Sequence, residues 1–214
     1  MEKLINKILI LYKKHLDIDS KQEAILKYSL KLLISSIEGY VLALVIAWAL
    51  GIFPYVLIAM VTVSTLRVFS GGAHCSNATN CILYGAITMN ALGALSRIIE
   101  FSKITELVFI SLIFSYGLWA IRKYAPADTP GKPISTKLQK DRLRRRSALV
   151  ACIWAVLAFA LTFGYREQGH ILTYASSIGI LWQSFTLTNI GYKLCHAMDR
   201  ILSRMLMRKG EPSC

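Results

Sequence analysis

Residues 30–50 read LKLLISSIEGYVLALVIAWAL. The run is long enough to cross a membrane, because an α-helix rises about 1.5 Å per residue and the hydrocarbon core of a bilayer is about 30 Å thick. Its charged residues are Lys31, near the start, and Glu38. The residues that follow, GIFP at 51–54, predict a tight reversal, since Pro54 cannot continue a helix. The sequence therefore predicts a first membrane span here.

Working outward from this run, the rest of the chain has the same character. The 214 residues are 55% hydrophobic with a mean hydropathy of +0.49, which is too apolar for an ordinary soluble domain. Further apolar runs cover 54–69, 81–95, 104–120, 147–163 and 171–190. We therefore expect an all-α, polytopic integral membrane protein with about six transmembrane helices. The runs 54–69 and 81–95 are short, so we expect residues 70–80 between them to dip into a protected cavity.

The two ends of the chain are amphipathic rather than uniformly apolar. Residues 1–29 carry Leu, Ile and Lys at helical spacing, with a break near 17–20 and a second helix capped by Ser20. Residues 193–214 alternate apolar and basic positions in the same way and predict a surface helix. With no internal repeat, residues 1–214 form one membrane-embedded domain whose six-span core is 30–192.

The charge of the chain is distributed unevenly. The chain has 25 Lys and Arg against 12 Asp and Glu, for a net charge of +13. If the N-terminus is cytoplasmic, six spans place all of these basic residues inside except Arg97, Lys103 and Arg166. The positive-inside rule then puts both termini and the 70–80 loop in the cytoplasm, beside anionic inner-leaflet lipids. Nucleic acid is a much weaker explanation of the charge, because membrane-length apolar runs flank each basic cluster.

The five cysteines do not form a framework. They have neither CxxC pairs nor regular spacing, which argues against disulfides and against a zinc knuckle. His74 with Cys75 or Cys81 could contribute to a zinc site, but such a site needs three or four ligands and no further cluster accompanies them. We expect no metal and no cofactor.

Residues 67–81, RVFSGGAHCSNATNC, hold the residue types of a cysteine nucleophile with its base. A thiol attacks as thiolate, and a neighbouring imidazole can accept and return the proton. Gly71 and Gly72 allow a sharp turn or close approach of a substrate. Arg67 could hold a substrate carboxylate or carbonyl. On a continuous helix His74 and Cys81 would lie about 10.5 Å apart, so the loop must bend.

Other interpretations of this stretch stay open. Cys75 is a rival nucleophile, although a side chain adjacent to His74 normally points elsewhere. Taken alone, His74 could be an ordinary loop histidine and Cys81 a small apolar residue at the start of a span.

A second motif, YAPADTPGKPI at 124–134, follows after the next pair of spans. Together the two motifs resemble the AgrB family, the membrane endopeptidases of Gram-positive quorum-sensing systems. The resemblance covers nearly the whole chain. It implies a cell-membrane cysteine endopeptidase that cleaves the C-terminal part of an AgrD-like propeptide, with Cys81 as nucleophile and His74 as base. It also implies that Arg67 and Gly72 are required, and that an acyl-enzyme thioester leads to a cyclic thiolactone or lactone.

A third catalytic group is not evident from the sequence. Asp128 lies in the second motif. Glu38 is an ionisable residue inside a span, where such residues are costly and tend to be functional. Glu38 could orient His74 or bind a cationic propeptide, and it could equally form a structural pair.

The basic segment that contains Lys140, Arg144, Arg145 and Arg146 has two interpretations. These residues could anchor the topology at the lipid headgroups or attract an acidic propeptide tail. The main alternative to the peptidase is a small peptide exporter in which the two short spans are broken helices around a midplane site. A membrane adaptor without enzymatic activity is a further alternative, and the sequence leaves a homodimer open.

Overall fold

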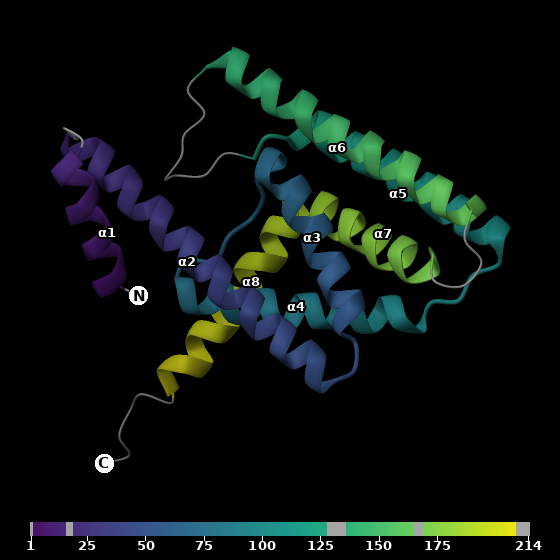
Figure 1. The fold of residues 1–214 in the computed structure, drawn as a ribbon, viewed down its shortest axis with the longest axis horizontal. Coiled ribbons are helices and arrows are strands. Elements are labelled where there is room, and N and C mark those ends of the chain that lie inside the picture. The colour runs from purple at the N-terminus through teal and green to yellow at the C-terminus, as the bar shows by residue number, and fades with distance from the viewer. Residues whose placement is uncertain (1, 16–18, 128–135, 165–168, 209–214) are drawn as a thin grey trace.

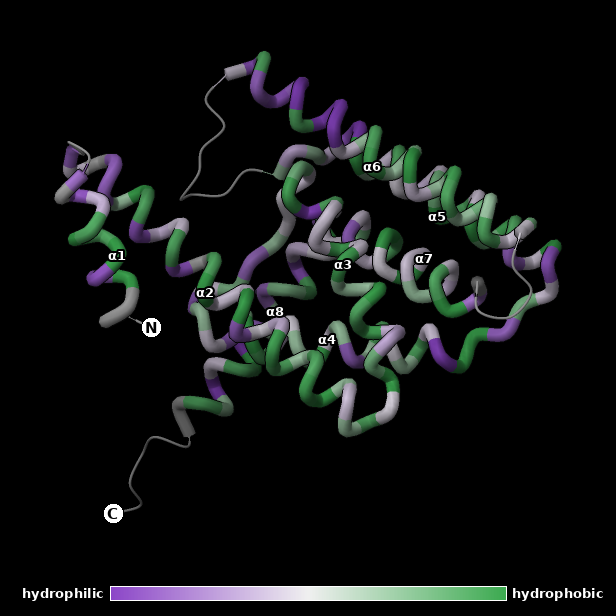
Figure 2. Tube along the Cα trace, in the orientation of Figure 1, coloured by the Kyte–Doolittle hydropathy of each residue, from purple (hydrophilic) through white to green (hydrophobic). Residues whose placement is uncertain are grey.

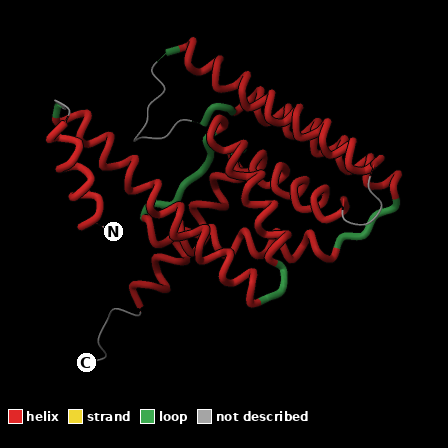
Figure 3. Tube along the Cα trace, viewed as in Figure 1, coloured by secondary structure: helices red, strands yellow, loops and turns green. Residues whose placement is uncertain are grey.

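The computed structural model describes residues 2–15, 19–127, 136–164 and 169–208, and these contain eight helices and no strand (Figures 1 and 3). The helices are α1 (Glu2–His15), α2 (Ser20–Ala49), α3 (Phe53–Ser70), α4 (Ala78–Ile98), α5 (Lys103–Tyr124), α6 (Lys137–Gly164), α7 (Gly169–Thr186) and α8 (Asn189–Arg208). The prediction of an all-α polytopic membrane protein is confirmed.

The first predicted span is part of a longer helix. α2 runs without interruption for 30 residues, so the predicted second amphipathic helix and the first span are one element. Its N-cap is Asp19, one residue before the predicted Ser20: the Asp19 carboxylate accepts from the Gln22 backbone N–H at 2.6 Å, and the Gln22 side chain accepts from the Asp19 N–H at 3.2 Å. This reciprocal capping box fixes where the helix starts.

Five of the described helices are long and apolar enough to cross a membrane, namely α2, α3, α4, α5 and α6. The two short runs correspond to α3, with 18 residues, and α4, with 21 residues. α4 begins at Ala78 and continues to Ile98, beyond both predicted limits of 81–95. Both are continuous, which gives no support to the broken helices of the exporter hypothesis.

The sixth predicted span, 171–190, corresponds to α7, which ends earlier, at Thr186, and is not among those five. α7 packs against α3, α4, α5 and α6 and therefore lies inside the bundle. Its buried side chains include Thr173, Ser177, Gln183 and Ser184. These polar residues lower its hydropathy, and they are tolerated because they face protein rather than lipid.

Hydrogen bonds locate the two ends of the bundle. At one end the hydroxyl of Tyr174, near the start of α7, accepts from the Phe101 N–H at 3.2 Å, in the connection between α4 and α5. At the other end the 71–77 loop between α3 and α4 meets α8, since Asp199 accepts from the Ser76 N–H at 3.0 Å. Helix α1 and the end of α8 lie toward this second end, on the left of Figure 1. The hydrophilic start of α6 lies there too (Figure 2).

The C-terminal helix is not only a surface helix. One face of α8 packs against α4 and α7, and it buries Cys195, Asp199 and Leu202. The amphipathic pattern predicts a surface helix, but part of the apolar face contacts protein. α1 also packs against its neighbour α2, with Ile5 and Leu9 buried.

Candidate active site

The bend between α3 and α4 requires glycine. Gly71 and Gly72 have φ angles of +68° and +148°, a region that side chains other than hydrogen disfavour. A Cβ on Gly71 would collide with the carbonyl oxygen of Ala127. The Ala127 N–H donates to the Ser70 carbonyl at 2.8 Å, beside the same turn. The start of the second sequence motif therefore packs directly on the first.

The guanidinium of Arg67 holds the loop from inside. It donates to the carbonyl oxygen of Ala73 and, at 3.3 Å, to the side-chain oxygen of Gln183 on α7. The Gln183 amide donates in turn to the Gly71 carbonyl at 2.7 Å and to the Ser70 hydroxyl at 3.0 Å. Gln183 is fully buried, so its bonds tie the loop to the central helix. Arg67 thus donates two hydrogen bonds to the protein itself, whereas the sequence predicts that it holds a substrate carboxylate or carbonyl.

Cys81 lies in the first turn of α4. The Asn77 side chain caps this helix by accepting from the Asn80 N–H at 2.8 Å, and the Cys81 N–H donates to the Asn77 carbonyl at 3.1 Å. The partial positive charge of a helix N-terminus is therefore close to the thiol. The cap explains why the chain turns into a helix here, which brings Cys81 back toward the loop.

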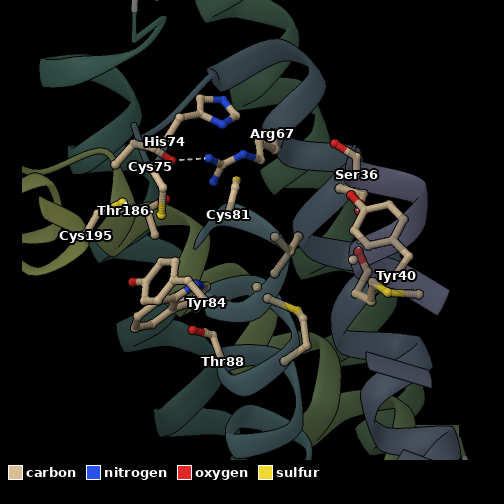
Figure 4. A pocket seen from close by; sticks show the side chains of 18 of the residues that line it. Ser36, Tyr40, Arg67, His74, Cys75, Cys81, Tyr84, Thr88, Thr186 and Cys195 are labelled. Atoms are coloured by element: carbon tan, nitrogen blue, oxygen red, sulfur yellow. Dashed lines mark hydrogen bonds between the residues drawn. The ribbon is translucent and has the colours of Figure 1, made fainter. Parts of the chain in front are cut away.

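Arg67, His74 and Cys81 line one cavity of about 140 Å³. Figure 4 shows the His74 ring, the Arg67 guanidinium and the Cys81 thiol gathered at the same end of it. Residues 71–77 lie outside the helices and bring His74 and Cys81 to the same cavity, so the predicted bend of the loop is confirmed. The Nδ1 nitrogen of the His74 ring is buried with no hydrogen-bond partner among the described residues.

Cys75 lies in a different environment from Cys81. Its sulfur is 4.0 Å from that of Cys195 on α8. Hydrogen bonds with Cys195 and then with Cys81 raise the pKa of the Cys75 thiol, and burial adds to the effect. Cys75 is therefore held as a neutral thiol, which favours Cys81 as the reactive sulfur.

Asp199 on α8 braces the loop and the start of α4. Its carboxylate accepts from the Ser76 N–H and, at 2.6 Å, from the Asn80 side chain. Burial opposes ionisation, but these hydrogen bonds outweigh it and keep the pKa of Asp199 below its usual range. Sequence reasoning missed both Asp199 and Gln183. The available signal for Gln183 was an amide inside an apolar run, and the signal for Asp199 was its place as the single acidic residue of a basic helix.

Glu38, a further predicted site residue, does not line the cavity. Glu38 is exposed on the outer face of α2, while its neighbours Ser35 and Gly39 line the cavity. A role for Glu38 in orienting His74 is therefore not supported. Asp128 lies outside the described residues.

The basic cluster divides into two groups. Arg144 donates to the Ala125 carbonyl at 2.8 Å, and the Arg146 guanidinium lies 6.0 Å from the centre of the Phe69 ring. These two contact the segments that flank the site. Lys140 and Arg145 are exposed on the first turns of α6. None of the four lines the cavity.

No group of three His, Cys, Asp or Glu side chains within the described ranges is arranged to hold a metal ion. The site as described consists of a thiol, an imidazole and a guanidinium beside an apolar cavity. Such a set can perform nucleophilic acyl transfer, in which the imidazole moves the proton.

Comparison with known proteins gives one consistent result. The family model described as Accessory gene regulator B matches residues 2–187. An AgrB-like protein of Clostridium perfringens (strain 13) is 31% identical over 198 residues, which cover 89% of this chain and 92% of that protein. Accessory gene regulator protein B of Staphylococcus aureus (strain MW2) is 28% identical over 179 residues, or 84% of this chain and 89% of that protein.

Accessory gene regulator protein B of Staphylococcus intermedius is 31% identical over 145 residues, covering 68% of this chain and 71% of that protein. No solved structure matches the chain significantly. The family match spans α1 to α7 and includes both sequence motifs. The chain therefore belongs to the accessory gene regulator B family.

Proposed function

We propose that this protein is a membrane cysteine endopeptidase that cleaves the C-terminal part of an AgrD-like propeptide. The observation that carries the proposal is the common cavity of Cys81, His74 and Arg67 at the end of the bundle that holds most of the basic residues. Family membership supports a role in accessory gene regulation. The shared cavity of Cys81, His74 and Arg67 supports the proposed cysteine-endopeptidase chemistry.

In the proposed reaction His74 takes the proton from the Cys81 thiol, and the sulfur attacks the carbonyl carbon of the scissile bond. The Arg67 guanidinium stabilises the oxyanion that forms. The carbon–nitrogen bond then breaks, and His74 returns the proton to the leaving amine. The peptide remains on Cys81 as a thioester.

The thioester keeps the free energy needed for ring closure. A thiol or hydroxyl in the bound propeptide attacks its carbonyl, releases Cys81 and forms a thiolactone or lactone. Ring closure competes with hydrolysis only if water is kept away. The apolar lining of the cavity, which includes Met60, Val63 and Met89, favours this exclusion.

The buried Nδ1 of His74 is the position at which a third group would act. A carboxylate that accepted its proton would fix the ring and its tautomer. Asp128 follows Ala127 directly in the chain, and Ala127 packs against the Gly71 turn. The sequence offers no evident third catalytic group; on this chain proximity we propose Asp128 for the role, and not Glu38, which is exposed on α2.

We propose that both termini and the 71–77 loop face the cytoplasm of a Gram-positive cell. Arg97 and Lys103 are the described basic residues at the opposite end of the bundle, near the connection between α4 and α5. The positive-inside rule then assigns that end to the outside. Anionic inner-leaflet lipids would contact the basic end, and association as a homodimer stays a prediction.

Co-expression tests the function directly. The chain is produced with candidate AgrD-like propeptides, and cell extracts are analysed by mass spectrometry for the cleaved and cyclised products. We expect both products with the native chain and uncut propeptide with Cys81→Ala. Equal cleavage by the two chains would contradict the proposed nucleophile.

A further inference from the structure

The cavity beside Cys81 has a polar end and an apolar end. Arg67, His74 and Cys81 form the polar end, next to the loop. Met60 and Met89 line the cavity deeper in the bundle and are themselves buried. Along α4, Met89 lies eight residues after Cys81, which corresponds to about 12 Å of helix. The cavity thus leads from the reactive thiol into the apolar interior.

The size of the cavity limits what can occupy it. Its volume is about 140 Å³. Apolar cavities of roughly 150 Å³ in proteins stay dry and bind a molecule of benzene. A single side chain of the size of leucine, methionine or phenylalanine fits such a space, whereas a helix or a lipid chain does not.

The chemistry of the lining limits the occupant further. Apart from His74, Arg67 is the only described lining residue with a formal charge, and its guanidinium already donates to Ala73 and Gln183. A charged side chain entering beyond it would lose hydration without gaining a charged partner. The lining also includes hydroxyl groups, such as those of Tyr84 and Thr88, but most of its surface is apolar, so an apolar occupant fits it best.

We propose that this cavity is the specificity pocket for the residue whose carbonyl Cys81 attacks, and that this residue carries an apolar side chain no larger than a phenyl ring. The proposal rests on the endopeptidase function proposed above. Because the nucleophile lies on the cavity wall, the side chain that fills the cavity belongs to the residue bonded to Cys81 in the thioester.

Gly85 keeps this pocket open. It lies four residues after Cys81, on the same face of α4, and lines the cavity. A Cβ built on Gly85 would meet no heavy atom within 4 Å, so a larger residue there can extend into the pocket without a clash. Gly164, at the end of α6, has equally open surroundings but lies outside the cavity. The two glycines form a matched pair for substitution.

The test uses reactive peptides and does not require the natural propeptide. The full-length protein in phospholipid vesicles is treated with acetyl-glycyl-Xaa chloromethyl ketones, where Xaa is Ala, Leu, Phe or Asp. Thiolate attack forms a bond between the Cys81 sulfur and the methylene carbon, and chloride leaves. Mass spectrometry gives the rate of Cys81 alkylation, which is divided by the rate with iodoacetamide, a reagent too small to need the pocket.

We expect the Leu and Phe probes to alkylate Cys81 at least about tenfold faster than the Ala or Asp probe, after this normalisation. Gly85→Leu should bring the ratio of the Cys81 alkylation rates with the Phe and Ala probes close to one, and Gly85→Ala should lower this ratio by a smaller factor. Gly164→Leu should leave it unchanged.

Equal rates for all four probes, or a Phe preference that survives Gly85→Leu, would overturn the pocket while leaving Cys81 as the nucleophile. Failure of the proposed function gives a different result. In that case iodoacetamide and every probe would alkylate Cys75 and leave Cys81 unmodified.

Discussion

The side-chain amide nitrogen of Asn80 lies 2.6 Å from a carboxylate oxygen of Asp199, and the bond joins the first turn of α4 to α8. The same nitrogen also lies 3.2 Å from the Asp199 carbonyl oxygen and 2.8 Å from the Ser203 hydroxyl, so its two hydrogens are shared among three acceptors. Because Asn80 directly precedes Cys81, the position of the proposed nucleophile depends on a helix more than a hundred residues later in the chain.

Asp199→Ala should therefore displace Cys81 as well as weaken the fold. The Ser76 N–H loses its carboxylate acceptor and the buried Asn80 amide loses one of its acceptors, and a hydrogen bond to a charged group contributes about 1.5–3 kcal/mol. We expect a lower midpoint of thermal unfolding and a lower kcat for propeptide cleavage. Asp199→Glu should recover part of both. A kcat equal to that of the native chain would show that α8 does not position the site.

The pH dependence of this contact has a definite sign. The folded pKa of Asp199 is below its usual value of 3.8, so the contact stabilises the fold fully above about pH 4 and loses this contribution as the pH falls through the lowered pKa. The destabilisation caused by Asp199→Asn should thus be the same at pH 5.5 and at pH 8. A difference that grows between these two values would contradict the assigned ionisation state.

Substitution of the sulfur and imidazole groups tests the catalytic assignment. Cys81→Ala and His74→Ala should each lower the rate of propeptide cleavage by roughly a thousandfold or more, since nucleophile and base act as a unit. Cys75→Ala is the matched control, because this thiol is held neutral beside Cys195 and should retain most of the activity. Loss of cleavage in Cys75→Ala with normal cleavage by Cys81→Ala would reverse the assignment.

The basic cluster is tested with its exposed members only. Replacing Lys140 and Arg145, together with the exposed neighbouring residue Arg142, by Gln should raise KM for a propeptide with an acidic tail about three- to tenfold, with less change in kcat, and should weaken the salt dependence. Arg144→Gln serves as a contrast, since Arg144 holds the Ala125 carbonyl next to the loop and should affect kcat. If KM and salt dependence stay unchanged in the triple variant, the cluster is a membrane anchor.

Topology can be measured by cysteine labelling. In a chain with its native cysteines replaced by Ala, a cysteine at Lys103 should react with a membrane-impermeant maleimide added to whole cells. A cysteine at Lys140 should react only after the membrane is opened. Reaction of the Lys140→Cys variant in intact cells would place the basic end, and with it Cys81, outside.

The opposite end of the bundle contains a polar cluster with no predicted role in catalysis. Glu106 on α5 is fully buried; it accepts from the Thr162 hydroxyl at 2.9 Å and lies 3.2 Å from His170 Nδ1. Glu106→Ala should lower the free energy of unfolding by about 1–3 kcal/mol and leave the rate of Cys81 alkylation by iodoacetamide unchanged. Thermal unfolding in detergent measures the first effect, and mass spectrometry measures the second.

The sequence predicted what depends on local pattern. Apolar runs of membrane length located α2 to α6, and the Gly71–Gly72 turn with His74 and Cys81 indicated the chemistry. It did not predict contacts between distant segments. Gln183 and Asp199 acquire their roles only when α7 and α8 pack against the 71–77 loop, and Glu38 could not be placed because a helical run alone does not show which face is buried.

The polar central helix α7 bears on how the protein is made. A helix with Thr173, Ser177 and Gln183 on protein-facing surfaces enters lipid poorly by itself, so it should leave the translocon together with α3 and α5, which are synthesised earlier. The bonds of Gln183 and Asp199 to the loop then form late. A nascent chain that still lacks α7 and α8 would carry the Cys81 thiol without its assembled surroundings, so we expect the proposed peptide cleavage to begin only once translation has passed Asp199.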